Sequence, residues 1–222
     1  MAHQPMSERP EITQACVKPL YDAKFIRVFD LEYAPGKHYY DATRRKQEEL
    51  VATKSDEEAK IMLPDAVSCV VVLEQDNEEP KLLLSMEYRY PAGRFLLSVP
   101  AGLIDPADRD SSDALTATAK REIQEETGLI VGDDAQITVI NPFLYSTPGM
   151  TDESNALVGV RMRVDDLSAL NQNGAEGSEC FNGFVLLTKA EARELMLSGR
   201  DREGNFYSVY TFMALCWFVA GF

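Results

Sequence analysis

Basic residues are scarce in this chain. Its 222 residues include 22 lysines and arginines against 36 aspartates and glutamates, which gives a formal net charge of −14 at pH 7. A surface with this excess of negative charge repels the phosphates of nucleic acid, and no basic run offsets it. We therefore expect no nucleic-acid polymer among the partners. Solubility alone explains the acidity, and the handling of cations or a small ligand is the alternative explanation.

Cysteine is also rare. The four cysteines are far apart in the sequence and form no CxxC pair: Cys16, Cys69, Cys180 and Cys216. This spacing argues against a zinc site and against a disulfide framework. We expect reduced thiols and a cytoplasmic protein.

Long apolar runs are missing as well. The first fifteen residues contain no apolar core of the kind found in secretion signals, so we expect no such signal. The apolar segment FMALCWFVAGF (212–222) has eleven residues, whereas a membrane span needs about 20. We expect a buried terminal helix and no membrane contact, with a dimer contact as the alternative for this helix.

The chain does contain many short hydrophobic segments bounded by turn residues. They predict strands at residues 24–33, 38–45, 66–73, 81–89, 95–100, 135–145, 155–164 and 183–188. Helices are predicted at residues 113–127, 189–199 and 207–221, and a polar loop at 165–179. The highly charged residues 46–60 indicate an exposed helix or linker and a domain boundary. This order predicts an α/β (α+β) fold, with a mixed sheet and helices on its faces.

The segment REIQEETGL (121–129) places three glutamates close together, at Glu122, Glu125 and Glu126. Its helix begins near Ser111, Ser112 or Asp113, and Gly128 suits a left-handed cap at its end. Along this helix two stripes lie about 100° apart. The apolar stripe is Leu115, Ala119 and Ile123, and the second stripe is Thr118, Glu122 and Glu126.

Like charges at this spacing repel by about a few tenths of a kcal/mol. A hard divalent cation such as Mg²⁺, or Mn²⁺, makes such a cluster of oxygen ligands favourable. Arg121 could neutralise part of the charge. The alternative is a solvated, glutamate-rich helix face that binds nothing.

The motif REIQEETGL, with PAGLID (100–105) before it, resembles the Nudix box, whose opening glycine would be Gly102. EYRYPAGRFLLSVPAGLID (87–105) and YSTPGMTDES (145–154) are similar to the ADP-ribose pyrophosphatase branch of the Nudix hydrolases. The resemblance spans most of residues 20–222. It implies a Nudix-like α/β/α sandwich at residues 63–222 and a small β-domain used for dimerisation at residues 1–62.

The resemblance also implies an activity: Mg²⁺-dependent hydrolysis of the pyrophosphate bond of ADP-ribose or a related nucleoside diphosphate sugar, giving AMP and ribose 5-phosphate, by a homodimer. The implied metal ligands are the carbonyl of Ala101, Glu122, Glu125 and Glu126, with Glu125 also a catalytic participant. A catalytic base is expected on the loop before the last core strand, at Glu179 or Glu176. Arg89 is expected to grip a substrate phosphate, and Pro148 and Gly149 to lie beside the substrate.

The chain departs from the box at two places. About five residues are inserted, so that Asp108 or Asp113 stands where the box has a glutamate that braces its arginine. Ser98 stands where this branch often has a glutamate, which bears on the metal shell or on substrate preference.

Several alternatives stay open. One is a non-catalytic ADP-ribose-binding regulatory domain, against which the intact glutamates argue. Another is a pyrophosphatase for GDP-mannose, a UDP-sugar, NADH or a dinucleoside polyphosphate. An aromatic of the amino-terminal strands could stack on adenine, although strand packing is the ordinary role of each candidate: Phe25, Phe29, Tyr33, Tyr39 and Tyr40.

Overall fold

The computed structural model describes residues 9–109, 113–175 and 177–221, which form two compact units. The smaller unit contains the described residues up to Leu63 together with Tyr145–Ser154, and the larger unit contains Pro64–Leu144 and the chain from Asn155 onward. The four cysteines all lie in the described ranges and are free thiols. Within those ranges, no helix combines the length and the apolar character that crossing a membrane requires.

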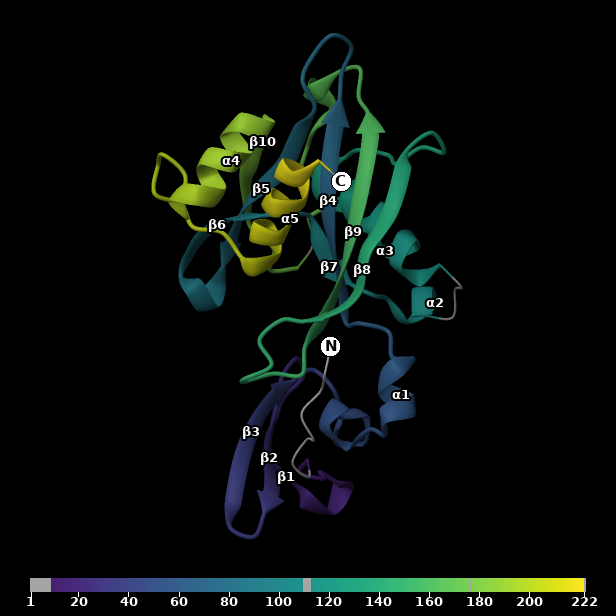
Figure 1. The fold of residues 1–222 in the computed structure, drawn as a ribbon, viewed down its shortest axis with the longest axis vertical. Coiled ribbons are helices and arrows are strands. Elements are labelled where there is room, and N and C mark those ends of the chain that lie inside the picture. Colours follow the sequence, from purple (N-terminus) through teal and green to yellow (C-terminus); the bar gives the residue numbers. More distant parts are fainter. Residues whose placement is uncertain (1–8, 110–112, 176, 222) are drawn as a thin grey trace, which may run out of the picture. The chain divides into compact units, whose positions relative to one another are not determined.

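The larger unit is built on a seven-stranded mixed sheet (Figure 1). The strand order is β10-β5-β4-β9-β8, with β6 paired to β5 and β7 to β4. Strands β4 and β9 run parallel, whereas β5 and β7 pair with β4 in antiparallel fashion. The strands are β4 Ala66–Glu74, β5 Lys81–Arg89, β6 Arg94–Ser98, β7 Ala101–Leu103, β8 Gln136–Tyr145, β9 Ser154–Arg163 and β10 Phe181–Leu187.

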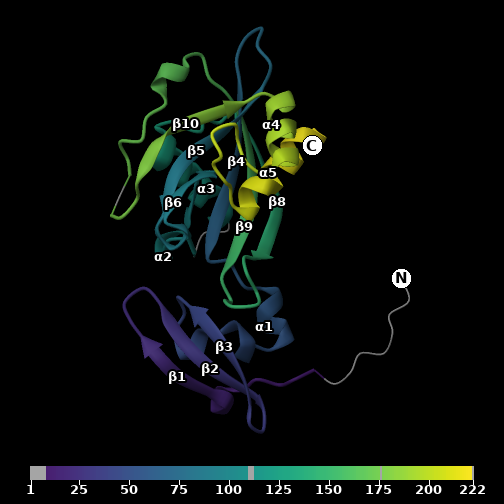
Figure 2. The same ribbon diagram turned by 90° about the vertical axis from the view of Figure 1, so that its left-hand side faces the viewer.

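Helices cover both faces of this sheet (Figure 2). Helix α3 (Ala114–Thr127) lies on one face, and α4 (Lys189–Ser198) and α5 (Val209–Ala220) lie on the other. Successive side chains of β4 point alternately toward the two helical layers. Cys69 Sγ contacts the carbonyl of Ala119 on α3, whereas Val70 and Val72 belong to the apolar core that includes Leu215 of α5. The predicted Nudix-like α/β/α sandwich is confirmed.

The loop after β9 is anchored to the carboxyl end of α3. The helix ends at Gly128, which adopts the predicted left-handed conformation with φ +73°. The amide of Asn171 donates to the carbonyl of Thr127 at 3.0 Å. A β-carbon at Gly174 would stand 2.4 Å from the carbonyl oxygen of Glu125, so the loop backbone passes directly over the helix end. These contacts hold the start of the loop that leads to β10.

The smaller unit contains a three-stranded antiparallel sheet in the order β1-β2-β3. Its strands are β1 Val17–Asp22, β2 Arg27–Ala34 and β3 Lys37–Thr43, and a short helix, α1 (Asp56–Lys60), follows. The small amino-terminal β-sheet is confirmed, although β1 was not predicted. Val17, Phe29, Leu31 and Leu50 form its own apolar core. Phe29 is only 3% exposed and has the ordinary packing role that was favoured for it.

The segment Tyr145–Ser154, which lies far from residues 1–63 in the sequence, is hydrogen-bonded to β3 of the smaller unit. The Tyr39 hydroxyl donates to the carbonyl of Gly149 at 2.8 Å. The amide of Ala42 donates to the carbonyl of Met150 at 3.0 Å. Membership of this segment in the smaller unit had no signal in the sequence. The domain boundary near residue 62 stays a prediction. The segment Tyr145–Ser154 joins the smaller unit in addition to the residues before that boundary.

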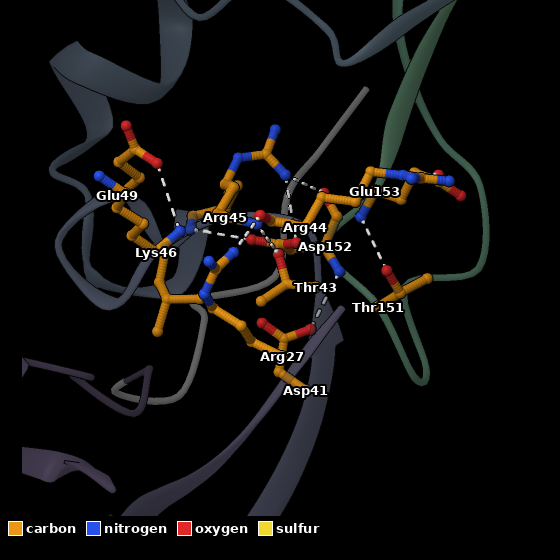
Figure 3. Close-up of polar contacts among 12 residues, drawn as sticks. Arg27, Asp41, Thr43, Arg44, Arg45, Lys46, Glu49, Thr151, Asp152 and Glu153 are labelled. Atoms are coloured by element: carbon orange, nitrogen blue, oxygen red, sulfur yellow. Dashed lines mark hydrogen bonds and ion pairs between the residues drawn. The ribbon is translucent and has the colours of Figure 1, made fainter. Parts of the chain in front are cut away.

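A buried polar cluster holds the same segment in place (Figure 3). Arg45 Nη1 lies 3.1 Å from Asp152 Oδ1, and the amide of Val51 donates to Asp152 Oδ2 at 3.2 Å. The amide of Asp152 donates to Asp41 Oδ1 at 3.1 Å. Asp41 Oδ2 is buried and has no hydrogen-bond partner among the described residues. Burial, and then the charge of Asp152, raise the pKa of Asp41 to about 6.

Candidate active site

The glutamates of REIQEETGL lie in the second half of α3. Glu122 is 6% exposed and Glu126 is 4% exposed, because this side of the helix packs toward β4 and β7. Thr118, one turn earlier on the same stripe, is fully buried. Glu125 has a side chain that is 41% exposed. The alternative of a solvated acidic helix face is therefore excluded for Glu122 and Glu126.

The backbone of strand β7 lies directly against these carboxylates. A β-carbon on Gly102 would stand 1.9 Å from Glu122 Oε1, so the carboxylate occupies the space that any other residue would fill. The amide of the preceding residue, Ala101, donates to Glu126 Oε1 at 3.4 Å. Any side chain at this glycine of PAGLID would therefore displace the Glu122 carboxylate from the backbone of β7.

Arg121 is the principal counter-ion of the helix carboxylates. Its Nη1 atom lies 2.7 Å from Glu122 Oε1 and 2.9 Å from Glu125 Oε2. Its Nη2 atom donates to the carbonyl of Leu103 at 2.9 Å, which ties the guanidinium to β7.

Two aspartates lie within ion-pair distance of Arg121, although its buried Nε atom makes no hydrogen bond within the described residues. Its Nε atom lies 3.5 Å from Asp105 Oδ2 and 3.6 Å from Asp108 Oδ2. Asp108 belongs to the short helix α2 (Pro106–Arg109) and also lies 3.4 Å from the Thr118 hydroxyl. Of the two aspartates expected to brace the arginine, Asp108 makes that contact, and Asp113 directly precedes α3. Residues 110–112, with the possible caps Ser111 and Ser112, lie outside the described residues.

The pKa values of these carboxyl groups are raised, because the groups are buried and have too little positive charge nearby. Burial raises the pKa of Glu122 to about 7, with the charge of Glu125 adding to the rise and Arg121 opposing it. Burial, then the charges of Glu87 and Glu122, raise the pKa of Glu126 well above its usual range. Perturbed pKa values of this kind cluster at functional sites, which makes these carboxyl groups candidates for such a site.

Glu87 on β5 is a member of this site that the sequence analysis missed. It is 7% exposed, and Arg89 Nη2 lies 2.6 Å from its Oε2 atom. Burial raises the pKa of Glu87, and Arg89 opposes the rise. The signal was present, since Glu87 is the one acid in the strand KLLLSMEYR. Arg89 is therefore tied to a buried carboxylate, and its role in binding phosphate stays a prediction.

Ser98 lies on β6 directly opposite Ser85 of β5. Both serines are buried, and neither hydroxyl makes a hydrogen bond of ordinary geometry within the described part of the chain. The Ser98 hydroxyl lies toward the Glu87 carboxyl, whose pKa it slightly lowers. The position where an acid was expected thus holds a buried hydroxyl next to an acid on the neighbouring strand.

Glu179 lies near the cluster. Two contacts of the residues that follow it determine its place: the amide of Tyr88 donates to the carbonyl of Cys180 at 2.8 Å, and Phe181 pairs with Glu87. Glu179 is exposed, and its charge helps to raise the pKa of Glu87, Glu122 and Glu126. The other candidate base, Glu176, lies outside the described residues. Which of the two is the base stays a prediction.

Pro148 and Gly149 belong to the segment Tyr145–Ser154 of the smaller unit. The carbonyl of Gly149 accepts the hydrogen bond from Tyr39. Their role beside the substrate stays a prediction.

The donor set fits a hard divalent cation, because it consists of clustered carboxylate oxygens, those of Glu122 and Glu126 buried, whose mutual repulsion a cation would relieve. In the described ranges, no three histidine, cysteine or acidic side chains already converge as a complete metal site. Arg121 bridges Glu122 and Glu125 instead, and Arg89 pairs with Glu87. A cation that binds here would have to compete with these guanidinium groups.

Comparison with known proteins identifies the class. The NUDIX domain family matches residues 62–206, and the chain belongs to this family. A protein of Caenorhabditis elegans with a nudix hydrolase name is 36% identical over 121 residues, which cover 54% of this chain and 50% of that protein, so the chain spans about half of this relative's length.

Two further relatives carry names that concern ADP compounds. The ADP-ribose pyrophosphatase of Bacillus subtilis is 27% identical over 150 residues, covering 68% of this chain and 72% of that protein. A solved structure titled "Crystal structure of ADP compounds hydrolase" matches with a TM-score of 0.56 at 18% identity and covers 98% of both chains. At that identity the structure supports the fold alone.

Proposed function

We propose that this protein hydrolyses the pyrophosphate bond of ADP-ribose or a related nucleoside diphosphate sugar in the presence of Mg²⁺, giving AMP and ribose 5-phosphate. The buried pair Glu122 and Glu126, packed against Gly102 and Ala101 in a chain of the Nudix family, supports this proposal above all. The name of the Bacillus subtilis relative makes ADP-ribose the first substrate to test.

The acidic cluster would hold the cation. Glu122, Glu125 and Glu126 offer carboxylate oxygens, and Ala101 offers its carbonyl. When bound, Mg²⁺ or Mn²⁺ neutralises pyrophosphate charge and acidifies the attacking water. Without such a cation, a substrate with two phosphates would meet a net negative site.

Two other side chains have proposed roles. Glu179, or alternatively Glu176, accepts the proton of the water that attacks one phosphorus, and the bridging oxygen leaves with the other phosphate. Arg89 contacts a phosphate through its planar guanidinium. The residues directly after Glu179 pair with β5, beside Glu87, so its carboxylate lies near the cluster.

A substrate panel tests the activity. The protein is incubated with Mg²⁺ and, separately, ADP-ribose, GDP-mannose, a UDP-sugar, NADH and a dinucleoside polyphosphate, and the products are separated by anion-exchange chromatography. Release of AMP and ribose 5-phosphate from ADP-ribose is the expected result. Binding of ADP-ribose without cleavage would favour the non-catalytic regulatory domain, and cleavage of a different compound alone would replace the substrate.

We also propose that the smaller unit mediates a homodimer. Its sheet and adjoining loop expose several large apolar side chains: Leu20, Tyr21, Phe25, Ile26, Tyr33 and Tyr40. Exposed apolar surface of this kind is typical of interaction sites. Light scattering after size exclusion should give twice the chain mass of 24.8 kDa, and a monomer at all concentrations would refute the dimer.

A further inference from the structure

Glu87 is a buried carboxylate that the motif REIQEETGL and its flanks do not assign to any role. Leu82, Leu84 and Met86 of β5 pack in the core on the α4 and α5 side. Because strand side chains alternate, Glu87 and Ser85 face the α3 side. Among the neighbouring charges, that of Glu87 contributes most to the raised pKa of Glu126. The sheet thus presents a carboxylate on the face that α3 covers, near enough for its charge to raise the pKa of Glu126.

We propose that Glu87 is a further acidic ligand of the divalent cation, and that Arg89 serves as its counter-ion until the cation binds. The inference rests on the proposed function, because it concerns the same cation. What it adds concerns two residues of β5. Glu87, a carboxylate outside the helix, completes the ligand set, and the guanidinium of Arg89 competes with the cation for Glu87.

A second observation supports a ligand here besides the acidic cluster. Ser85 is fully buried, and its hydroxyl has no hydrogen-bond partner in the described residues. Ser98 is 4% exposed, and its hydroxyl interacts with the Glu87 carboxyl, but without ordinary hydrogen-bond geometry. Buried hydroxyls without partners are costly, so such groups are normally satisfied by a bound group or by water. A carboxylate that turns toward a cation, or a water molecule on that cation, would accept hydrogen bonds from them.

The contact between Arg89 and Glu87 predicts in which direction the removal of Arg89 changes cation affinity. Arg89 Nη2 lies 2.6 Å from Glu87 Oε2, while the Arg89 side chain is 47% exposed and the Glu87 side chain only 9%. The arginine can therefore move into solvent at little cost, whereas the carboxylate cannot. If guanidinium and cation compete for Glu87, removal of Arg89 should strengthen cation binding, although it removes a residue from the site.

Titration with Mn²⁺, followed by the electron paramagnetic resonance signal of the free ion and without nucleotide, tests the proposal. Glu87→Gln should weaken Mn²⁺ binding about tenfold, because the ligand loses its charge. Arg89→Gln should tighten Mn²⁺ binding about threefold, because a competing positive charge is gone. Glu126→Gln serves as the positive control and should also weaken binding.

Matched controls come from a second Glu–Arg pair of the larger unit. Glu74, at the opposite end of β4 from β7, lies 2.7 Å from Arg161. Glu74→Gln and Arg161→Gln should leave Mn²⁺ affinity unchanged. Circular dichroism establishes that each variant is folded, and Arg89→Gln, at an exposed side chain, keeps the test decisive should Glu87→Gln fail to fold.

The possible results separate this inference from the proposed function. Wild-type affinity in Glu87→Gln, with affinity lost in Glu126→Gln, would overturn the role of Glu87 and leave the proposed function standing. Weaker Mn²⁺ binding in Arg89→Gln would overturn the competition. A wild-type protein that binds no Mn²⁺ would overturn both the inference and the cation on which the proposed function depends.

Discussion

The carboxylate of Glu122 occupies the space beside the Cα atom of Gly102, where a β-carbon would stand 1.9 Å from Oε1 and 2.0 Å from the carboxyl carbon. Two segments that are separated by the inserted residues meet at this contact. The absence of a side chain at Gly102 leaves the space on β7 in which the carboxylate from α3 lies.

Gly102→Ala should therefore displace the Glu122 carboxylate. The backbone of Gly102 has no left-handed conformation, so the variant should fold, while turnover of ADP-ribose falls about tenfold or more because the carboxylate is misplaced. Gly132→Ala is a matched control, since its β-carbon would also meet a carboxylate oxygen, Asp134 Oδ1 at 2.7 Å, outside the site. Equal activity of the two variants would contradict the importance of the Gly102 contact.

Glu126→Gln should give a folded protein whose turnover is at least about a hundredfold lower, because a neutral amide is a poor ligand for Mg²⁺. The same change should raise the melting temperature of the metal-free protein, since a buried carboxylate with a raised pKa is replaced by a neutral group. Steady-state kinetics and thermal melts in EDTA measure the two effects. Normal turnover would refute the assignment of Glu126.

Glu179→Gln should lower kcat about a hundredfold and change the acidic limb of the pH–rate profile, because the proposed base is lost. Glu176→Gln is its counterpart and should have the smaller effect. The profiles are measured as kcat/KM between about pH 5 and pH 9. If the two variants both keep the wild-type profile, neither loop glutamate is the base.

Arg45→Ala should destabilise the smaller unit by about 3 kcal/mol, because two buried carboxylates, Asp41 and Asp152, lose their cation. The side chains of Arg45 and Asp152 are only 11% and 9% exposed. Arg44→Ala removes a neighbouring ion pair with Glu153, whose side chains are 51% and 37% exposed, and should cost less than about 0.5 kcal/mol. Urea unfolding compares the variants, and limited proteolysis reports on Tyr145–Ser154. Equal stability would show that burial of the Arg45 pair is unimportant.

Asp41→Asn should stabilise the protein at neutral pH. Because the folded pKa of Asp41, about 6, lies above its ordinary value of 3.8, the folded state binds the proton more tightly than the unfolded state. The wild type therefore gains stability as the pH falls from about 7 to about 4 and loses it as the pH rises. The side-chain oxygen of the new amide could still accept from the main-chain amide of Asp152. The advantage of the variant should be about 1–2 kcal/mol above pH 7 and vanish near pH 4. An advantage independent of pH would show that titration of Asp41 is not its cause.

Much of the larger unit could be predicted from local pattern. Alternating and continuous apolar segments indicated β4, β5, β6, β8, β9 and β10, because buried strands need apolar side chains. The helix α3 and its end at Gly128 followed from capping and spacing. The strands β1 and β7 were missed for different reasons: VKPLYD is mostly exposed and shows little apolar periodicity, and AGL has only three residues.

The sequence by itself determined the family, most of the strands and helices and the three glutamates of one helix, because these depend on residue type and spacing within short stretches of the chain. Only the tertiary structure decided which groups surround those glutamates. Glu87, Ser85 and Ser98 come from strands whose facing side chains are set by register, and Tyr145–Ser154 joins the smaller unit through Arg45 and Asp152. Contacts between residues distant in the chain depend on how elements pack, and the pattern within each element does not encode that packing.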